Sequence, residues 1–163
     1  MKQQGYIAVK NFFDTHPKLK KFLVLIQKGA EILIYLTYPV FIAVLFLANN
    51  WFWAKSVVVC GVGFILVSLF RHFYNAPRPY QVYDIQPVIN KNTKGKSMPS
   101  RHCFSASVIA LSVSVINLPL GIIIGVLALI IAILRVAFGV HFIKDVLAGL
   151  IVGILIGFIQ YFI

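Results

Sequence analysis

Apolar residues run through most of this chain in long stretches that are separated by short polar segments. About 20 apolar residues are enough for an α-helix to cross a bilayer. Stretches close to this length occupy residues 30–48, 54–73, 102–117, 120–138 and 141–161. These runs are continuous rather than alternating, which argues against a β-barrel. The pattern predicts an all-α integral membrane bundle of about five transmembrane helices.

The N-terminal segment has a different pattern, in which apolar and basic positions are interleaved. Its uninterrupted apolar run at residues 22–26 is too short to span a bilayer, and Pro17 suits a helix start. We interpret residues 1–28 as amphipathic helices lying in the membrane interface. A longer, tilted first helix with a basic tail is the alternative. We expect one domain over residues 1–163, with its transmembrane core at residues 30–163.

Composition supports the membrane class and narrows the partners. Hydrophobic residues make up 60% of the chain and the mean hydropathy is +0.91, both high for a soluble domain. The net charge is +11, but the cations sit in the N-terminal segment and in the loop at residues 74–100. We therefore expect a membrane and phosphate groups as partners rather than nucleic acid. The four carboxylates are scattered, which argues against a two-metal site, and we expect no cofactor.

An ionisable cluster interrupts the apolar C-terminal region. From residue 118 onward the only charged side chains are Arg135, Lys144 and Asp145. His141 and Asp145 are four residues apart, so on one helix the carboxylate could hold one imidazole nitrogen and leave the other free. An oriented imidazole suits attack on phosphorus or proton transfer, and Arg135 would neutralise charge on phosphoryl oxygens. A core histidine with satisfied hydrogen bonds is the alternative.

Two further places carry candidate chemistry. Arg71 and Arg78 are seven residues apart and could clamp one anion from two directions, although an arginine at a helix end also occurs as a membrane-surface contact. Ser100 could cap a helix whose free N–H groups attract an anion, and His102 could donate a proton there. An ordinary helix cap with an interfacial histidine is the alternative. The count of spans puts these places and His141 on one membrane face.

In chain order the three places read R-x6-R-P, P-S-R-H and R-x5-H-x3-D. The series resembles the type 2 phosphatidic acid phosphatase (PAP2) superfamily, whose pattern is K-x6-R-P, P-S-G-H and S-R-x5-H-x3-D. The resemblance covers residues 71–145. It implies a small bacterial membrane lipid phosphatase that needs no metal and works through a phosphohistidine intermediate.

The resemblance also implies a role for each matching residue. His141 is expected to be the nucleophile, with Asp145 as its orienting partner. His102 is expected to protonate the leaving oxygen and then to activate water. The residues expected to bind phosphate are Arg71, Arg78, Ser100, Arg101 and Arg135.

The chain departs from the family pattern at three positions. Arg71 replaces a lysine, which keeps the charge but changes the geometry. Leu134 replaces a serine, so one polar contact is missing. Arg101 replaces a glycine, and its side chain could contact a second phosphate or the headgroup, or narrow the pocket. None of these changes removes the nucleophile or a proton carrier, so we expect activity.

Substrate and orientation stay open at this point. The expected substrate is a lipid phosphate whose tail remains in the membrane, with undecaprenyl pyrophosphate, phosphatidylglycerol phosphate and phosphatidic acid as candidates. The excess of cations on the active-site face favours the cytoplasm. The resemblance to bacterial relatives favours the extracytoplasmic face of the cell membrane, which we adopt. An anion or lipid transporter and a catalytically silent scaffold are the other functional classes, and the oligomeric state is undetermined.

Overall fold

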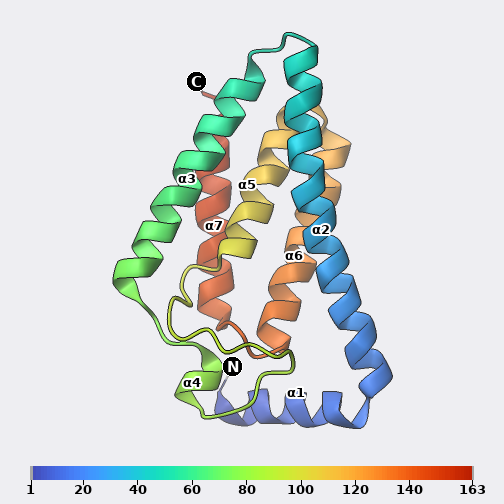
Figure 1. The fold of residues 1–163 in the computed structure, drawn as a ribbon, viewed down its shortest axis with the longest axis vertical. Coiled ribbons are helices and arrows are strands. Elements are labelled where there is room, and N and C mark those ends of the chain that lie inside the picture. Colours follow the sequence, from blue (N-terminus) through green and yellow to red (C-terminus); the bar gives the residue numbers. More distant parts are fainter. Residues whose placement is uncertain (1, 163) are drawn as a thin grey trace.

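The computed structural model describes residues 2–162, which form seven helices and no strand. Five helices run along the long axis of the molecule, α1 lies across one end, and α4 is a single turn in the polar segment at that end (Figure 1). The helices are α1 (Gln3–Thr15), α2 (Pro17–Leu47), α3 (Phe52–Tyr74), α4 (Pro79–Val82), α5 (Arg101–Ile116), α6 (Leu118–Ala137) and α7 (Ile143–Ile159).

The five long helices correspond to the five predicted spans. Among the described residues, α2, α3 and α6 are long and apolar enough to cross a membrane, while α5 and α7 are shorter at 16 and 17 residues. The outer surfaces of these helices expose large apolar side chains such as Leu36, Leu66 and Ile133. A surface of this kind suits contact with lipid rather than water. The chain is a multi-pass membrane protein, as predicted.

The centre of the bundle is α5, which is enclosed by its neighbours (Figure 1). All residues from Cys103 to Ala110 are buried. Helix α7 approaches α5 closely at two glycines, because a side chain at Gly149 would collide with the carbonyl oxygen of Ser100 and one at Gly153 with the hydroxyl of Ser107. This approach fixes the start of α7 beside the start of α5.

Both alternatives for the N-terminal segment describe part of what is found. Helix α1 is a separate amphipathic helix that buries Tyr6 and Phe13 and exposes Phe12. Residues 17–28 are not a second interfacial helix, because they continue without a break into α2. At ~1.5 Å per residue the 31 residues of α2 span ~46 Å, more than the ~30 Å hydrocarbon layer. The first turns of α2 therefore extend beyond that layer.

The α1 end of the bundle is closed by three segments that are distant in sequence. The polar segment between α3 and α5 crosses this end above α1 (Figure 1). It is attached to the α6–α7 turn by a hydrogen bond from the N–H of Val88 to the carbonyl of Phe138, 3.0 Å long. Helix α1 is attached to the same turn, since the hydroxyl of Tyr6 donates to the carbonyl of His141 over 3.3 Å. These contacts shape a polar chamber at the membrane surface.

Candidate active site

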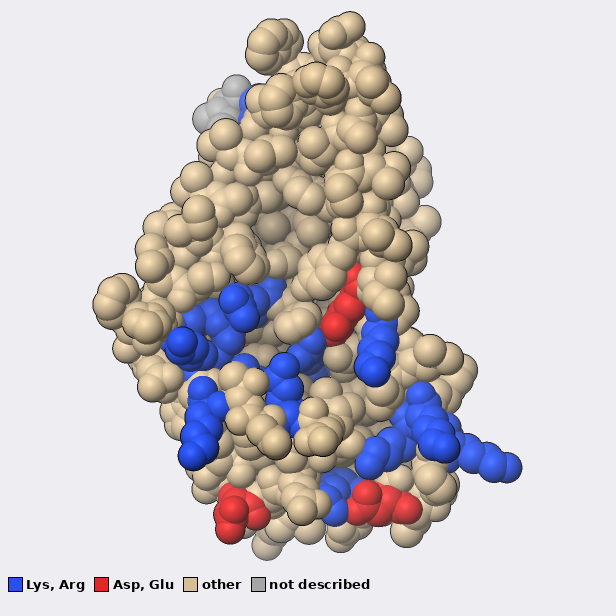
Figure 2. Space-filling view, viewed as in Figure 1, with Lys and Arg blue, Asp and Glu red and all other residues tan. Residues whose placement is uncertain are grey.

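A cavity of about 240 Å³ lies at the α1 end of the bundle. Six of the eight predicted site residues line it: Arg71, Arg78, Arg101, His102, Arg135 and His141. They come from α3, from the following loop, from α5, from α6 and from the α6–α7 turn. Most of the cationic side chains visible in Figure 2 gather around this end of the molecule. The three motifs do meet on one face, as the sequence predicted.

His141 and Asp145 form the expected pair, but not on one helix. Helix α6 ends at Ala137, the chain turns at Gly139 with a φ of 72°, and His141 lies two residues before α7. Asp145 is in the first turn of α7, where its Oδ2 accepts the N–H of Phe142 over 2.9 Å. The same oxygen lies 3.6 Å from Nδ1 of His141. The capped helix start therefore orients the carboxylate.

Ser97 connects this histidine and aspartate, and the sequence analysis missed it. Its hydroxyl donates to Oδ2 of Asp145 over 2.5 Å and lies 3.3 Å from Nδ1 of His141. All three side chains are almost fully buried. Because Nδ1 faces Ser97 and Asp145, Nε2 of His141 is left for the cavity. No motif marks Ser97, which lies in the polar loop three residues before Ser100.

The protonation of His141 follows from its surroundings. Burial, together with the charges of Arg78 and Arg135, lowers the pKa of His141 below its ordinary value, while the hydrogen bond to Asp145 opposes this shift. The net direction is downward. The imidazole is therefore neutral near pH 7, which is the form that can act as a nucleophile.

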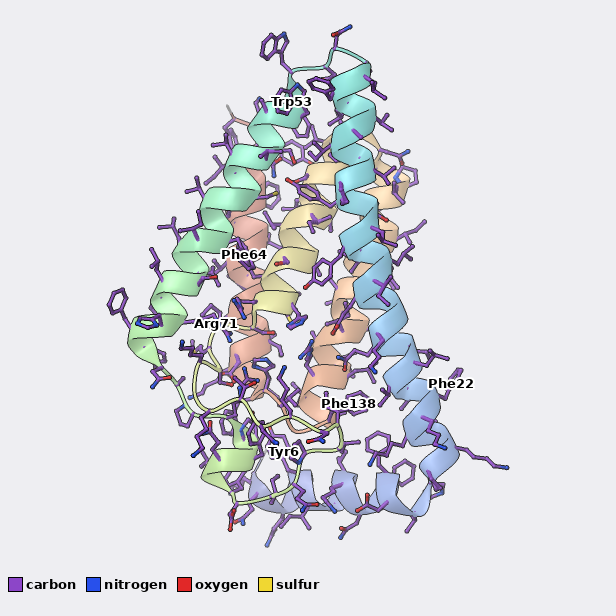
Figure 3. The ribbon with its side chains drawn as sticks, in the orientation of Figure 1. Tyr6, Phe22, Trp53, Phe64, Arg71 and Phe138 are labelled. Carbon is purple, nitrogen blue, oxygen red and sulfur yellow. The ribbon has the colours of Figure 1, made fainter. Side chains whose placement is uncertain are left out.

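Arg71 and Arg78 are buried, line the cavity and bind backbone carbonyls of the segments around it. Arg71 donates through its guanidinium to the carbonyls of Lys96, Ser97 and Pro99, on the chain that leads into α5. Figure 3 shows Arg71 on the inner side of α3, below Phe64. These contacts fix Arg71 beside the cavity.

Arg78 makes a similar set of contacts. Its Nε donates to the carbonyl of Gly95 over 3.1 Å, and a terminal nitrogen donates to the carbonyl of Val140 over 3.2 Å. Burial lowers the pKa of Arg78, but the ordinary value for arginine is so high that the group stays charged. Arg78 thus links the polar loop to the turn that carries His141.

His102 and Arg101 begin α5 and point to different neighbours. His102 is partly exposed to the cavity and lies near Tyr35 of α2, with a ring separation of 6.5 Å. Arg101 extends toward α3, where its guanidinium lies 5.7 Å from the ring of Phe64. The extra cation of this chain is therefore held by a cation–π contact at the edge of the cavity.

Ser100 occupies the N-cap position of α5, as predicted, but its hydroxyl makes no capping hydrogen bond and the residue does not line the cavity. Its N–H donates to the backbone carbonyl of Asp145 over 2.8 Å. Its hydroxyl is buried without a hydrogen-bond partner. Ser100 therefore ties α5 to α7 in this structure, and its contact with phosphate stays a prediction.

Arg135 has a partner that the sequence analysis missed. Its guanidinium donates to Oε1 of Glu31 on α2 over 2.6 Å, while its Nε is buried without a partner. In the sequence Glu31 is one of four scattered carboxylates, and no motif links it to Arg135. Its position inside an apolar stretch was the available signal, since a carboxylate there is costly. Leu134, beside Arg135, packs in an apolar cluster with Phe13 and Phe138, which accounts for an apolar residue at this position.

Several known proteins are similar to this chain in sequence or in fold. The undecaprenyl-diphosphatase BcrC of Bacillus subtilis (strain 168) is 26% identical over 165 residues, which cover 99% of this chain and 83% of BcrC. The crystal structure of Aquifex aeolicus LpxE has a TM-score of 0.75 and 25% identity, covering 97% of this chain and 93% of LpxE. The crystal structure of a PAP2-type phosphatidylglycerolphosphate phosphatase from Bacillus subtilis has a TM-score of 0.72 and 25% sequence identity, covering 98% of this chain and 84% of that protein.

The family assignment rests on a match that extends beyond the segment containing the three motifs. The profile of the PAP2 superfamily matches residues 51–163, which is more than half of the chain and includes every predicted motif. The chain therefore belongs to the PAP2 superfamily.

Proposed function

We propose that this protein is a membrane lipid phosphatase that hydrolyses the phosphomonoester or diphosphate of a lipid through a phosphohistidine. The observation that carries the proposal is the cavity, in which two histidines from different helix starts face a cluster of buried arginines. Guanidinium groups in a low-dielectric site stabilise the charge that develops on phosphoryl oxygens. A cavity of about 240 Å³ accommodates a phosphate group with part of its leaving group.

The proposed reaction has two steps. In the first, Nε2 of His141 attacks phosphorus, the bond from phosphorus to the leaving oxygen breaks, and His102 gives that oxygen a proton. In the second, His102 takes a proton from water as the water attacks the phosphohistidine, which releases inorganic phosphate and frees His141. Asp145 keeps Nδ1 of His141 oriented and stabilises the positive charge on the ring while the P–N bond exists.

An apolar groove beside the cavity supports a lipid substrate. It has a volume of about 340 Å³ and lies between α2, α3 and α5. Tyr35 and Phe64 line it, and these two residues are also the neighbours of His102 and Arg101. Figure 2 shows the molecular surface hollowed above the cationic cluster on this face. A lipid tail in this groove would place its phosphate at the cavity.

The names of the relatives supply candidate substrates. BcrC is an undecaprenyl-diphosphatase and one structural relative is a phosphatidylglycerolphosphate phosphatase. Both substrates are lipid phosphates, one a diphosphate and the other a monoester. We propose that this chain takes a substrate of this class, with undecaprenyl pyrophosphate, phosphatidylglycerol phosphate and phosphatidic acid to be compared directly. We also propose that the site faces the outside of the cell membrane.

Phosphate release by the purified protein in detergent tests the proposal. We expect wild type to release phosphate from at least one of the three lipids in the presence of EDTA, and His141→Ala to release none. Lack of release from every lipid would favour a transporter or a silent scaffold. Activity that depends on an added divalent ion would contradict the phosphohistidine mechanism.

A further inference from the structure

Glu31 is the only charged side chain between residues 30 and 47 of α2. It is mostly buried, with its side chain 18% exposed, and it faces the cavity end of α6 rather than lipid. A carboxylate inside an apolar helix is costly and requires partners. Its partners show that Glu31 belongs to the active-site region.

The two oxygens of Glu31 have different neighbours. Oε1 accepts hydrogen bonds from Nε2 of Gln27 over 2.8 Å and from Arg135 over 2.6 Å. Oε2 lies 4.0 Å from Nε2 of His102. The two donors on Oε1 hold the carboxylate plane, so that the remaining oxygen is directed toward the imidazole. His102 thus has a carboxylate neighbour, as His141 has Asp145.

The electrostatic surroundings of His102 make this neighbour important. Cationic side chains approach from α6, from the polar loop and from α5 itself, and they share the cavity lining with His102 and His141: Arg135, Lys91 and Arg101. Positive charge nearby disfavours the protonated imidazole. Among residues 2–162, Glu31 is the only carboxylate within 4.0 Å of His102. It is therefore the group that can favour the protonated ring.

We propose that Glu31 is a positioning residue for His102, which it holds in the orientation and protonation state needed to protonate the leaving oxygen. This inference rests on the proposed function. During the first step His102 loses its proton to the leaving oxygen and becomes neutral, and in the second step it regains a proton from the attacking water. Glu31 takes part in neither proton transfer, and it also holds Arg135 at the edge of the cavity.

The test uses two substrates that differ in whether the leaving group must be protonated as it departs. Octyl phosphate has a poor leaving group that must be protonated, whereas 4-nitrophenyl phosphate releases a stable phenolate. We expect Glu31→Gln to lower kcat/KM about 30-fold for octyl phosphate and no more than about 3-fold for 4-nitrophenyl phosphate, because general acid catalysis contributes roughly 10²–10⁴-fold. Glu31→Asp, which keeps the charge, should recover part of the loss on octyl phosphate.

The controls separate this role from a structural one. His102→Ala must also lose more kcat/KM on octyl phosphate than on 4-nitrophenyl phosphate. Asp14→Asn, which removes an exposed carboxylate of α1, should behave as wild type. Equal losses of Glu31→Gln on both substrates, or a gain in activity, would overturn the proposal while leaving the proposed function intact. Equal losses of kcat/KM on the two substrates in His102→Ala would instead contradict the role given to His102. Gel filtration in detergent would identify a variant that fails to fold.

Discussion

The hydroxyl of Ser97 donates a hydrogen bond of 2.5 Å to Oδ2 of Asp145 and lies 3.3 Å from Nδ1 of His141. A serine from the polar loop thus completes the orientation of the proposed nucleophile. Because Asp145 is buried and its Oδ1 has no partner, the hydrogen bonds on Oδ2 carry the whole alignment of this carboxylate.

Ser97→Ala should lower kcat/KM about tenfold, with kcat affected more than KM. Loss of one buried hydrogen bond to a charged group costs on the order of 1.5 kcal/mol, which corresponds to roughly a factor of ten in rate. The measurement is phosphate release in detergent. Ser107→Ala is the matched control, because Ser107 is also buried but bonds only to carbonyls of its own helix. An equal decrease in both variants would contradict the role of Ser97.

The pH dependence should reflect the neutral form of His141. Burial and the neighbouring arginines lower its pKa, so the ring stays unprotonated at pH values where an ordinary histidine is charged. The nucleophile is thus retained as pH falls through about 6.5 and is lost only below the lowered pKa. We expect the acid limb of kcat/KM to lie below pH ~6.5. The substrate's own ionisation, measured separately by ³¹P NMR, must be subtracted, and a remaining limb at or above ~6.5 would contradict this expectation.

Arg101→Gly, which restores the residue usual in the family, tests the extra cation. Arg101 lines the cavity but is held toward Phe64. We expect KM to rise by up to about fivefold, with little change in kcat, because one solvent-exposed ion pair contributes roughly 0.2–1 kcal/mol. Steady-state kinetics on a lipid diphosphate and a lipid monoester measure the change. A fall in KM would show that the side chain narrows the pocket instead of attracting phosphate.

Membrane orientation can be tested by labelling single engineered cysteines in intact cells. Both native cysteines, Cys60 and Cys103, are buried, so they give a low background. We expect Lys94→Cys, in the active-site loop, to react with a membrane-impermeant maleimide added outside. Lys55→Cys, at the opposite end of α3, should react only after the cells are opened. The reverse pattern would place the site in the cytoplasm, as the distribution of cations suggests.

Much of the fold could be predicted, because hydrophobic length is a direct consequence of the bilayer. The lengths of the apolar runs predict the five spans. The first turns of α2 are harder to predict, since residues 17–28 contain many basic residues and no long apolar run. They are helical because they extend an apolar helix beyond the hydrocarbon layer, and the pattern within the segment does not contain that information.

The candidate site was partly predictable for a related reason. Residues with fixed spacing, such as Arg135, His141 and Asp145, could be grouped from the sequence. Ser97 and Glu31 could not, because each reaches the site through tertiary contacts, 44 and 104 residues away from His141 and Arg135 respectively. The expected helical pairing of His141 with Asp145 was wrong in detail. The turn at Gly139 places the histidine outside α7, and the contact forms across the helix start.

The proposed mechanism predicts that phosphate becomes covalently bound to His141 during turnover. Its most direct test is rapid quenching of the enzyme with ³²P-labelled 4-nitrophenyl phosphate, followed by alkaline denaturation, which preserves a P–N bond. His102→Ala should retain the most label, because the leaving group needs no proton and hydrolysis is slowed. We expect label on wild type and on His102→Ala, all of it acid-labile, and none on His141→Ala. Turnover without any labelled protein, or label that persists in His141→Ala, would contradict the account.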